Sequence, residues 1–287
     1  MTATIILGLS IAMLLFLLTS GLTLIFGMLG VINFAHGALY MLGAYLAYQI
    51  GESSGSFTVA LVLTPLALAV VGFGIERWLL RPLYARDHVE QFLMTFGLIL
   101  VINEVVRIVW GFGYVDASEP AFLSGAVEIA GSQIPVYRFF LLGVGVATGA
   151  ALWFMIDRTR LGIVLRAAMT HPEMVRSLGI QVDKVRTLVF CIGAGLAGLA
   201  GAVAAPILPI QLGMGFSIII DCFVVVILGG LGDIRGAFLA AILLGAIQTV
   251  GQQYYPEWTE IGKYVLLLLV LMLRPEGIFS RGSGRLA

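Results

Sequence analysis

Long apolar runs, separated by short segments that hold most of the charged residues, dominate the hydrophobic pattern of this chain. Many of the runs approach the roughly 20 residues that a helix needs to cross a hydrocarbon layer of about 30 Å. The pattern predicts nine helical spans: 5–26, 37–50, 57–76, 92–110, 138–156, 187–208, 216–229, 237–251 and 261–273. Because several runs are short for a straight crossing, we expect an all-α polytopic transmembrane bundle of about eight or nine spans, some broken or re-entrant.

The composition also indicates a membrane protein. Hydrophobic residues make up 60% of the 287 residues and charged residues 11%, against roughly 45–50% and about 25% in soluble domains. No water-soluble fold can bury so much apolar surface. The first run lacks the basic start and the cleavage site of a signal peptide, so we expect it to stay in the mature chain. Residues 1–287 should form a single transmembrane domain.

Most Lys and Arg residues lie in three connectors and in the tail, and short loops rich in these residues stay in the cytoplasm. The connectors that hold Glu52, Asp116 and Glu257 are acidic and nearly lack them. We therefore expect these acidic connectors to face outward and the C-terminal tail, with Arg281 and Arg285, to be cytoplasmic. The protein should lie in the inner membrane, in contact with lipid.

Small residues recur every four positions in the run 187–208, at Gly193, Ala197 and Gly201. Within a helix this spacing lines up a smooth ridge, which lets a neighbouring backbone approach closely. We expect a central helix here, with the small residues serving tight packing.

Two glycine-rich interruptions separate apolar runs. The first, GMLGVINFAHG at 27–37, contains Asn33 and His36, and the second is GGLGDIRG at 229–236. Helices break inside a membrane protein only where protein or a water-filled cavity satisfies the freed backbone groups, so either segment could border a transport path. The alternative is a tight turn between helices, with Asn33 as an N-cap.

Two acidic residues stand within apolar runs. Asp221 is an isolated carboxylate, which is costly in a membrane unless it is paired or wet, so it should face the bundle interior. There Asp221 could line the transport path. The alternative is that Asp221 lies at the outer membrane interface. Glu104 and Arg107 are three residues apart and should pair with each other.

The longest cytoplasmic loop, 157–186, differs from the other connectors because it contains the signals of a small helix. Thr170 and Glu173 have capping-box spacing, and Gly179 suits the helix end. The helix should expose Met174, Val175 and Leu178 on one side. Such a surface fits a groove on a soluble partner or, equally well, the membrane surface.

Several function classes are excluded by what the sequence lacks. The net charge is zero, with no basic patch for nucleic acid. The three histidines are far apart and predict no metal site, and Cys191 and Cys222 show no pairing signal. No GxxxxGK[ST] segment is present to bind nucleotide phosphates, no catalytic group can be assembled, and we expect no cofactor. The energy for transport must come from elsewhere, unless the chain is a self-sufficient channel or secondary carrier.

Four segments of the chain, in this order, resemble segments of the LivH-type permeases of branched-chain amino acid ABC importers. These segments are GLTLIFGMLGVINFAHGALYMLGAYLAY (21–48), RAAMTHPEMVRSLGIQVDKVRTLVFCIGAGLAGLAGA (166–202), VVVILGGLGDIRGAFLAAILLG (224–245) and LRPEGIFS (273–280). Asp233 and Arg235 depart from the small or neutral residues and proline expected in relatives.

The resemblance implies an assembly with a second, related permease, two cytoplasmic ATPase subunits and a periplasmic solute-binding protein. The loop helix would then dock in a groove of an ATPase subunit, and Asn33 and His36 would lie near the translocation path. Branched-chain amino acids are the expected substrates. The same permease type also serves urea and short amides, which leaves that alternative open.

Overall fold

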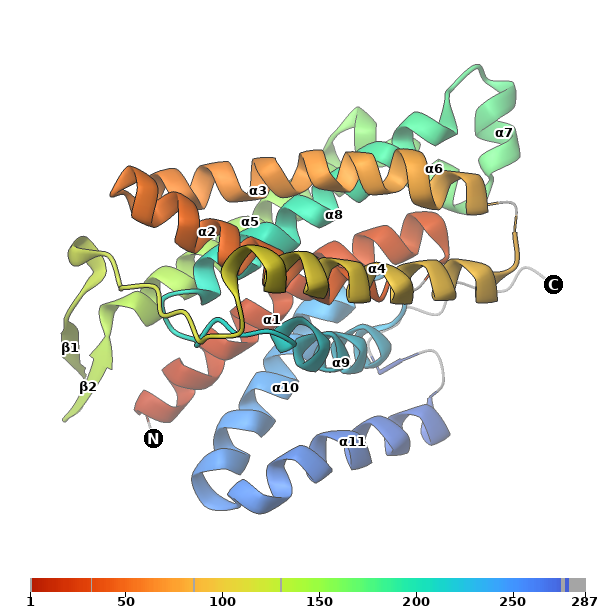
Figure 1. Cartoon of the computed structure of the whole chain (residues 1–287). Helices are drawn as coiled ribbons and strands as arrows, with labels where there is room; N and C mark the ends of the chain where they lie inside the picture. The colour runs from red at the N-terminus through yellow and green to blue at the C-terminus, as the bar shows by residue number, and fades with distance from the viewer. Residues whose placement is uncertain (1, 32, 85, 130, 275–276, 279–287) are drawn as a thin grey trace.

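The computed structural model describes residues 2–31, 33–84, 86–129, 131–274 and 277–278. Long helices, most of them running the length of the molecule, form one bundle (Figure 1). In the first half lie α1 (Thr2–Leu29), α2 (Ala35–Ser54), α3 (Phe57–Gly74), the π-helix η1 (Ile75–Leu80), the 3-10 turn η2 (Arg81–Leu83), α4 (His88–Trp110) and the 3-10 turn η3 (Ala121–Leu123). The second half holds β1 (Ala126–Ile129), β2 (Ser132–Pro135), α5 (Val136–Arg158), α6 (Arg160–Thr170), α7 (Pro172–Ser177), α8 (Val182–Ala204), α9 (Met214–Gly229), α10 (Ile234–Tyr254) and α11 (Pro256–Leu273).

Each of the nine predicted spans coincides with one helix, which confirms the helical membrane bundle. Within the described residues, six helices are long and apolar enough to cross a membrane. They are Thr2–Leu29, Phe57–Leu83, His88–Trp110, Val136–Arg158, Val182–Ala204 and Ile234–Tyr254, and Met214–Gly229 is a shorter apolar helix. The predicted helix positions are therefore correct, whereas the number of crossings stays a prediction.

The helix α1 occupies the middle of the bundle. It packs against α5, α8, α9 and α10 and is buried over most of its apolar length. The helices α3, α4 and α5 instead leave most of their apolar surface exposed. Exposed apolar surface of this extent suits lipid or a second membrane subunit, because water would disfavour it.

Small residues on α8 set the distance to its neighbours. A Cβ atom added at Gly193 would lie 2.5 Å from Cδ1 of Ile25 and 3.0 Å from the carbonyl oxygen of Gly21, both on α1. A Cβ atom at Gly201 would collide with the carbonyl oxygen of Tyr40 on α2. Ala197, between the two glycines, is fully buried. The backbones of α1 and α2 therefore approach α8 as closely as small residues allow.

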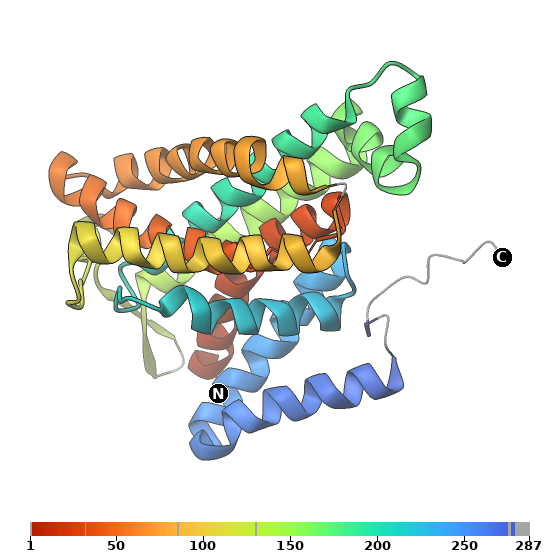
Figure 2. The same ribbon diagram turned by 45° about the vertical axis from the view of Figure 1, so that its right-hand side comes forward.

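The two ends of the bundle differ in structure. The helix α7 lies at one end and the β1–β2 hairpin at the opposite end, in both views (Figures 1 and 2). Ion pairs join basic connectors at the α7 end, where Arg81 meets Asp183 at 3.0 Å. The prediction that the C-terminal tail is cytoplasmic relies on Arg281 and Arg285. Both residues lie outside the described residues.

The hairpin is absent from the all-α prediction. Its strands are antiparallel, with Val127 opposite Ile134, and Gly131 has a φ of 76° at the turn. Ile134 is buried where the hairpin meets the start of α5. A four-residue strand gives only a weak alternation signal, which long apolar runs on either side obscure.

Candidate functional site

The break between α1 and α2 is a sharp turn that is exposed at Gly30 and buried at Asn33. The helix α1 ends at Leu29, Gly30 has a φ of 68°, and α2 begins at Ala35. Asn33 is 2% exposed, and neither its amide nitrogen nor its amide oxygen has a hydrogen-bond partner among the described residues. The tight turn of the predicted alternative is therefore present, but its N-cap is wrong, because the side chain of Asn33 does not cap α2.

His36 lies in the first turn of α2 and is fully buried. Its Nε2 atom lies 2.9 Å from the carbonyl oxygen of Leu18 on α1, and because a carbonyl only accepts, Nε2 carries the proton and donates. The Nδ1 atom has no partner within the described structure. A buried polar atom without a partner costs free energy, which suggests a site that changes its surroundings during function.

A small cavity joins Asn33 to α4. Asn33, Tyr84, Gln91 and Thr95 line it together with apolar side chains. Its volume is about 10 Å³, which is close to the smallest space that holds one water. The oxygen Oε1 of Gln91 also lacks a partner among the described residues. Sites for small molecules enclose roughly 300–1,000 Å³, so the structure is closed to a solute at this point.

Asp221, the carboxylate that stands alone within its apolar run, is paired and largely buried, as a charge at this depth requires. Lys263 on α11 places Nζ 2.6 Å from Oδ1 of Asp221, and Nε2 of Gln248 lies 3.3 Å from Oδ2. The side chain of Lys263 is only 4% exposed. The sequence separates the partners by an entire helix, so their pairing depends on the tertiary fold. The ion pair fastens α11 to α9.

The second glycine-rich break is a capped turn between α9 and α10. Oδ1 of Asp233 accepts hydrogen bonds from the backbone N–H groups of Arg235, at 2.9 Å, and Gly236, at 3.2 Å. The guanidinium of Arg235 pairs with Asp157 at the end of α5. Both residues that depart from the pattern of relatives therefore stabilise this end of the bundle. Glu104 and Arg107 pair as predicted.

The loop 157–186 contains two helices where the sequence predicted one. Thr159 caps α6 by accepting from the N–H of Gly162. The predicted capping box is wrong, because Thr170 belongs to the last turn of α6 and its hydroxyl donates to the carbonyl of Arg166 at 2.7 Å. Glu173 pairs with Arg176 instead.

The end of α7 has the predicted glycine. Gly179 has a φ of 80°, its N–H bonds the carbonyl of Arg176, and the N–H of Ile180 bonds the carbonyl of Val175. These two bonds form a Schellman motif, which stops the helix.

The exposed surface of α7 differs from the predicted one at a single position. Met174 is 62% and Leu178 73% exposed, whereas Val175 is 3% exposed. Val175 joins a core cluster with Leu165 of α6 and Met28 of α1, so it cannot belong to the outer face. The helix α7 is therefore fixed to the bundle on one side and presents two apolar residues on the other.

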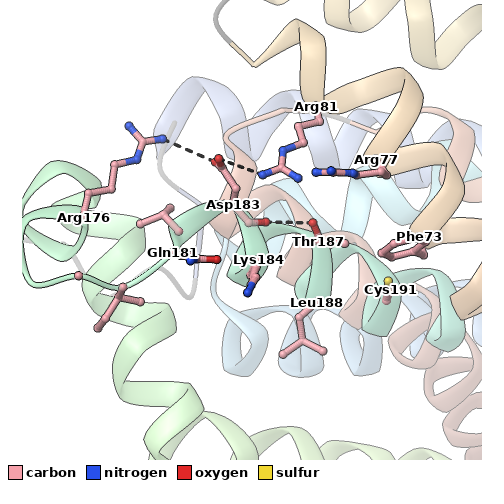
Figure 3. A pocket seen from close by; sticks show the side chains of 13 residues that line it. Phe73, Arg77, Arg81, Arg176, Gln181, Asp183, Lys184, Thr187, Leu188 and Cys191 are labelled. Atoms are coloured by element: carbon pink, nitrogen blue, oxygen red, sulfur yellow. Dashed lines mark hydrogen bonds and ion pairs between the residues drawn. The ribbon is translucent and has the colours of Figure 1, made fainter.

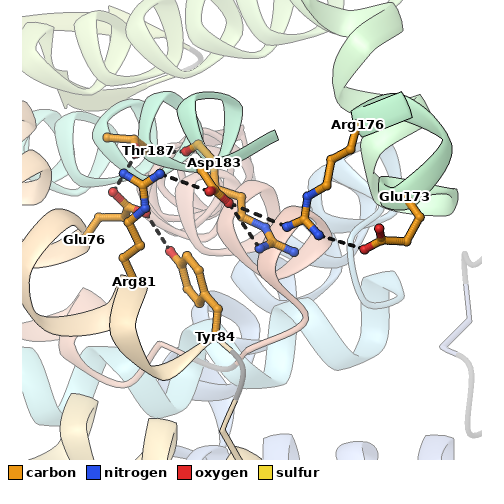
Figure 4. A network of polar contacts seen from close by, with 8 residues as sticks. Glu76, Arg81, Tyr84, Glu173, Arg176, Asp183 and Thr187 are labelled. Carbon is orange, nitrogen blue, oxygen red and sulfur yellow. Dashed lines mark hydrogen bonds and ion pairs between the residues drawn. The ribbon is translucent and has the colours of Figure 1, made fainter. Parts of the chain in front are cut away.

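A polar network below α7 connects three helices (Figure 4). Asp183 on α8 pairs with Arg81 at 3.0 Å and with Arg176 of α7 at 3.7 Å. Glu76 is fully buried and accepts hydrogen bonds from Thr187, at 2.6 Å, and from Tyr84, at 3.1 Å.

Burial, followed by the nearby carboxylate of Glu76, raises the pKa of Tyr84, so its hydroxyl stays a donor. Sequence reasoning missed Glu76. The available signal was a carboxylate at the end of an apolar run, next to a cluster of arginines. Through Asp183, the network links Arg176 of α7 to α8 and to Arg81 of η2.

The comparisons with known proteins decide the family. Residues 4–273 match the family model described as the permease component of the branched-chain amino acid transport system. The chain belongs to this family. The match spans nearly all of the described helices and confirms the resemblance drawn from the sequence.

Curated relatives cover almost the whole chain. The high-affinity branched-chain amino acid transport system permease protein BraD of Pseudomonas aeruginosa is 30% identical over 96% of this chain and 94% of its own. The corresponding permease protein LivH of Escherichia coli is 29% identical over 92% and 91%. The ribose import permease protein RbsC of E. coli is 28% identical over 92% and 80%.

A solved structure shares the fold. PsaBC from Streptococcus pneumoniae in complex with Fab aligns with a TM-score of 0.51 over 94% of this chain and 91% of that chain. Its sequence identity is 11%. This likeness supports the helical arrangement alone.

Proposed function

We propose that this chain is the permease subunit of an ATP-driven, binding-protein-dependent importer that moves branched-chain amino acids across the inner membrane. The observation that carries the proposal is the family match over residues 4–273, joined with the names of the relatives BraD and LivH. The working assembly contains a second, related permease, two cytoplasmic ATPase subunits and a periplasmic solute-binding protein. This chain is not an enzyme, and separate subunits hydrolyse the ATP.

The translocation path runs along the break between α1 and α2, next to Asn33 and His36. Two arguments support this location. Both side chains carry buried polar atoms that lack partners among the described residues. A groove of about 330 Å³ lies beside the break, lined by Gly30, Val31 and Phe34, whereas the cavity at Asn33 itself is far too small for an amino acid. The break must therefore rearrange before a solute passes, and the rearrangement offers these polar atoms new partners. Asp221 holds α11 in place and does not bind the solute, because its carboxylate is already paired with Lys263.

The helices α6 and α7 couple this path to the ATPase. The exposed side chains of Met174 and Leu178 enter a groove on an ATPase subunit, because apolar anchors on a short helix suit such a groove. Val175 and Arg176 then transmit the movement, Val175 through the core and Arg176 through Asp183 of α8. A helix lying passively on the membrane surface would not need the ion pair to α8.

The proposed topology has about nine crossings, since the helices α2, α9 and α11 add to the six longest ones. The basic α7 end faces the cytoplasm, as does the C-terminus, and the hairpin end faces outward.

Co-purification from a tagged version of this chain tests the assembly. The expected result is recovery of two ATPase subunits, a second permease and a periplasmic protein that binds leucine, isoleucine or valine. A periplasmic partner that binds ribose, urea or a short amide would contradict the proposed substrate but not the proposed assembly. Recovery of the chain alone, with transport activity in liposomes, would contradict the proposed assembly.

A further inference from the structure

A groove of about 930 Å³ opens at the α7 end of the bundle, between the end of α3 and the start of α8 (Figure 3). Its mouth is basic, with Arg77, Arg81, Arg176 and Lys184 among the lining residues. Its far wall is apolar and includes Phe73 and Leu188.

The charges at the mouth do not cancel. Among the described residues that line the groove, Asp183 is the one acidic residue, and it pairs with Arg81 and Arg176. Arg77 and Lys184 are exposed, and neither has an acidic partner within ion-pair distance in the described part of the chain. The groove therefore carries two uncompensated cations, and it favours an anion.

The cationic and the apolar residues of the groove lie at different heights along the helices that line it. Phe73 is one turn deeper than Arg77, and Leu188 is four residues, or about 6 Å, beyond Lys184. Both apolar side chains are partly exposed, at 47% and 41%. Trp78, next to Arg77, is 75% exposed, and tryptophan concentrates where a membrane meets water.

We propose that this groove binds an anionic phospholipid. The headgroup phosphate lies against Arg77 and Lys184, and an acyl chain runs along Phe73 and Leu188. Basic pockets between helices on the cytoplasmic side recognise such headgroups through charge. A soluble phosphate or nucleotide would use the cations and leave the apolar wall without a partner. An acidic protein segment would likewise leave the apolar end empty, since Phe73 and Leu188 lie on the membrane side of the mouth.

The proposal does not depend on the transported solute, but it places a lipid beside the proposed coupling helix. Arg176 of α7 and the first turn of α8 both line the groove. A bound anionic headgroup would therefore offset the surplus positive charge beside the network that joins α7 to α8.

Native mass spectrometry of the whole purified chain tests the proposal, with titration by phosphatidylglycerol and, separately, by phosphatidylcholine of the same acyl chains. The expected result is preferential retention of phosphatidylglycerol. Arg77→Gln/Lys184→Gln should weaken that binding about 20- to 30-fold, on the basis of about 1 kcal/mol per cation near an anionic lipid. Arg158→Gln/Arg160→Gln is the matched control, because it removes two exposed cations at the same end outside the groove. The control should bind as the unmodified chain does.

A second variant separates lipid from other anions. Leu188→Trp places a larger side chain at an exposed position of the apolar wall and so narrows the groove. It should reduce lipid retention, although Arg77 and Lys184 are unchanged. This variant also serves if the double glutamine variant does not fold. Equal retention of both lipids, equal loss in the control, or full displacement by inorganic phosphate would overturn the proposal. Loss of the lipid when ATPase subunits join the chain would assign the groove to a protein contact instead.

Discussion

Leu178 offers the sharpest test of the coupling surface, through the change Leu178→Glu. Its side chain is 73% exposed and lies at the end of α7, beyond the last helical residue. A substitution at such a position changes the free energy of unfolding by about 0.5 kcal/mol or less. The chain should therefore insert and fold normally.

The effect on docking is much larger than the effect on folding. Burying a leucine side chain in a partner groove contributes about 1.5–3 kcal/mol, so its loss weakens docking about 10- to 150-fold. The introduced carboxylate adds a desolvation cost, because it would enter the groove without a partner. Solute-stimulated ATP hydrolysis should consequently fall to the basal rate.

The assay compares ATP hydrolysis with and without loaded binding protein, in liposomes that hold the complete assembly. Ser177→Glu is the matched control, since it adds the same charge at the neighbouring exposed position and removes no apolar contact. It should retain most of the stimulation. Normal stimulation in Leu178→Glu, or an equal loss in Ser177→Glu, would refute the role of α7.

Three further predictions concern stability. Asp221→Asn should lower the free energy of unfolding by an amount near the lower end of about 3–5 kcal/mol, since Lys263 is left buried with one fewer carboxylate; thermal unfolding should show a partial recovery in Asp221→Met/Lys263→Met. Gly201→Leu should abolish folded protein in size-exclusion chromatography because a Cβ atom has no room there, whereas Gly97→Leu on α4, where the space is open, should be tolerated. Val175→Ala should lower the free energy of unfolding by about 1–3 kcal/mol, because Val175 is a core residue, and an unchanged melting temperature would return Val175 to the outer surface.

Hydropathy was sufficient to place the long helices, because every backbone group in lipid must be satisfied within a helix and apolar runs must therefore be helical. The same logic located the small-residue face of α8 and the break after α1. The ends of the helices were less accessible, since a cap depends on local geometry. Thr170 has the spacing of a cap, but α6 extends through it and its hydroxyl turns back to Arg166.

Tertiary contacts account for what the sequence could not predict. The partner of Asp221 lies on α11, in a segment that the charge pattern assigned to the outer side. Val175 is apolar like Met174 and Leu178, and only the position of α6 decides that it faces inward. Glu76 becomes interpretable as a bonded carboxylate only when Thr187 of α8 is brought next to it.

The central claim is that this chain encloses a path whose opening requires work delivered from the cytosol. Uptake of radiolabelled leucine into liposomes tests it most directly, with the chain alone compared with the complete assembly supplied with ATP and binding protein. The account predicts accumulation against a gradient in the complete assembly only. Accumulation by this polypeptide alone would contradict it.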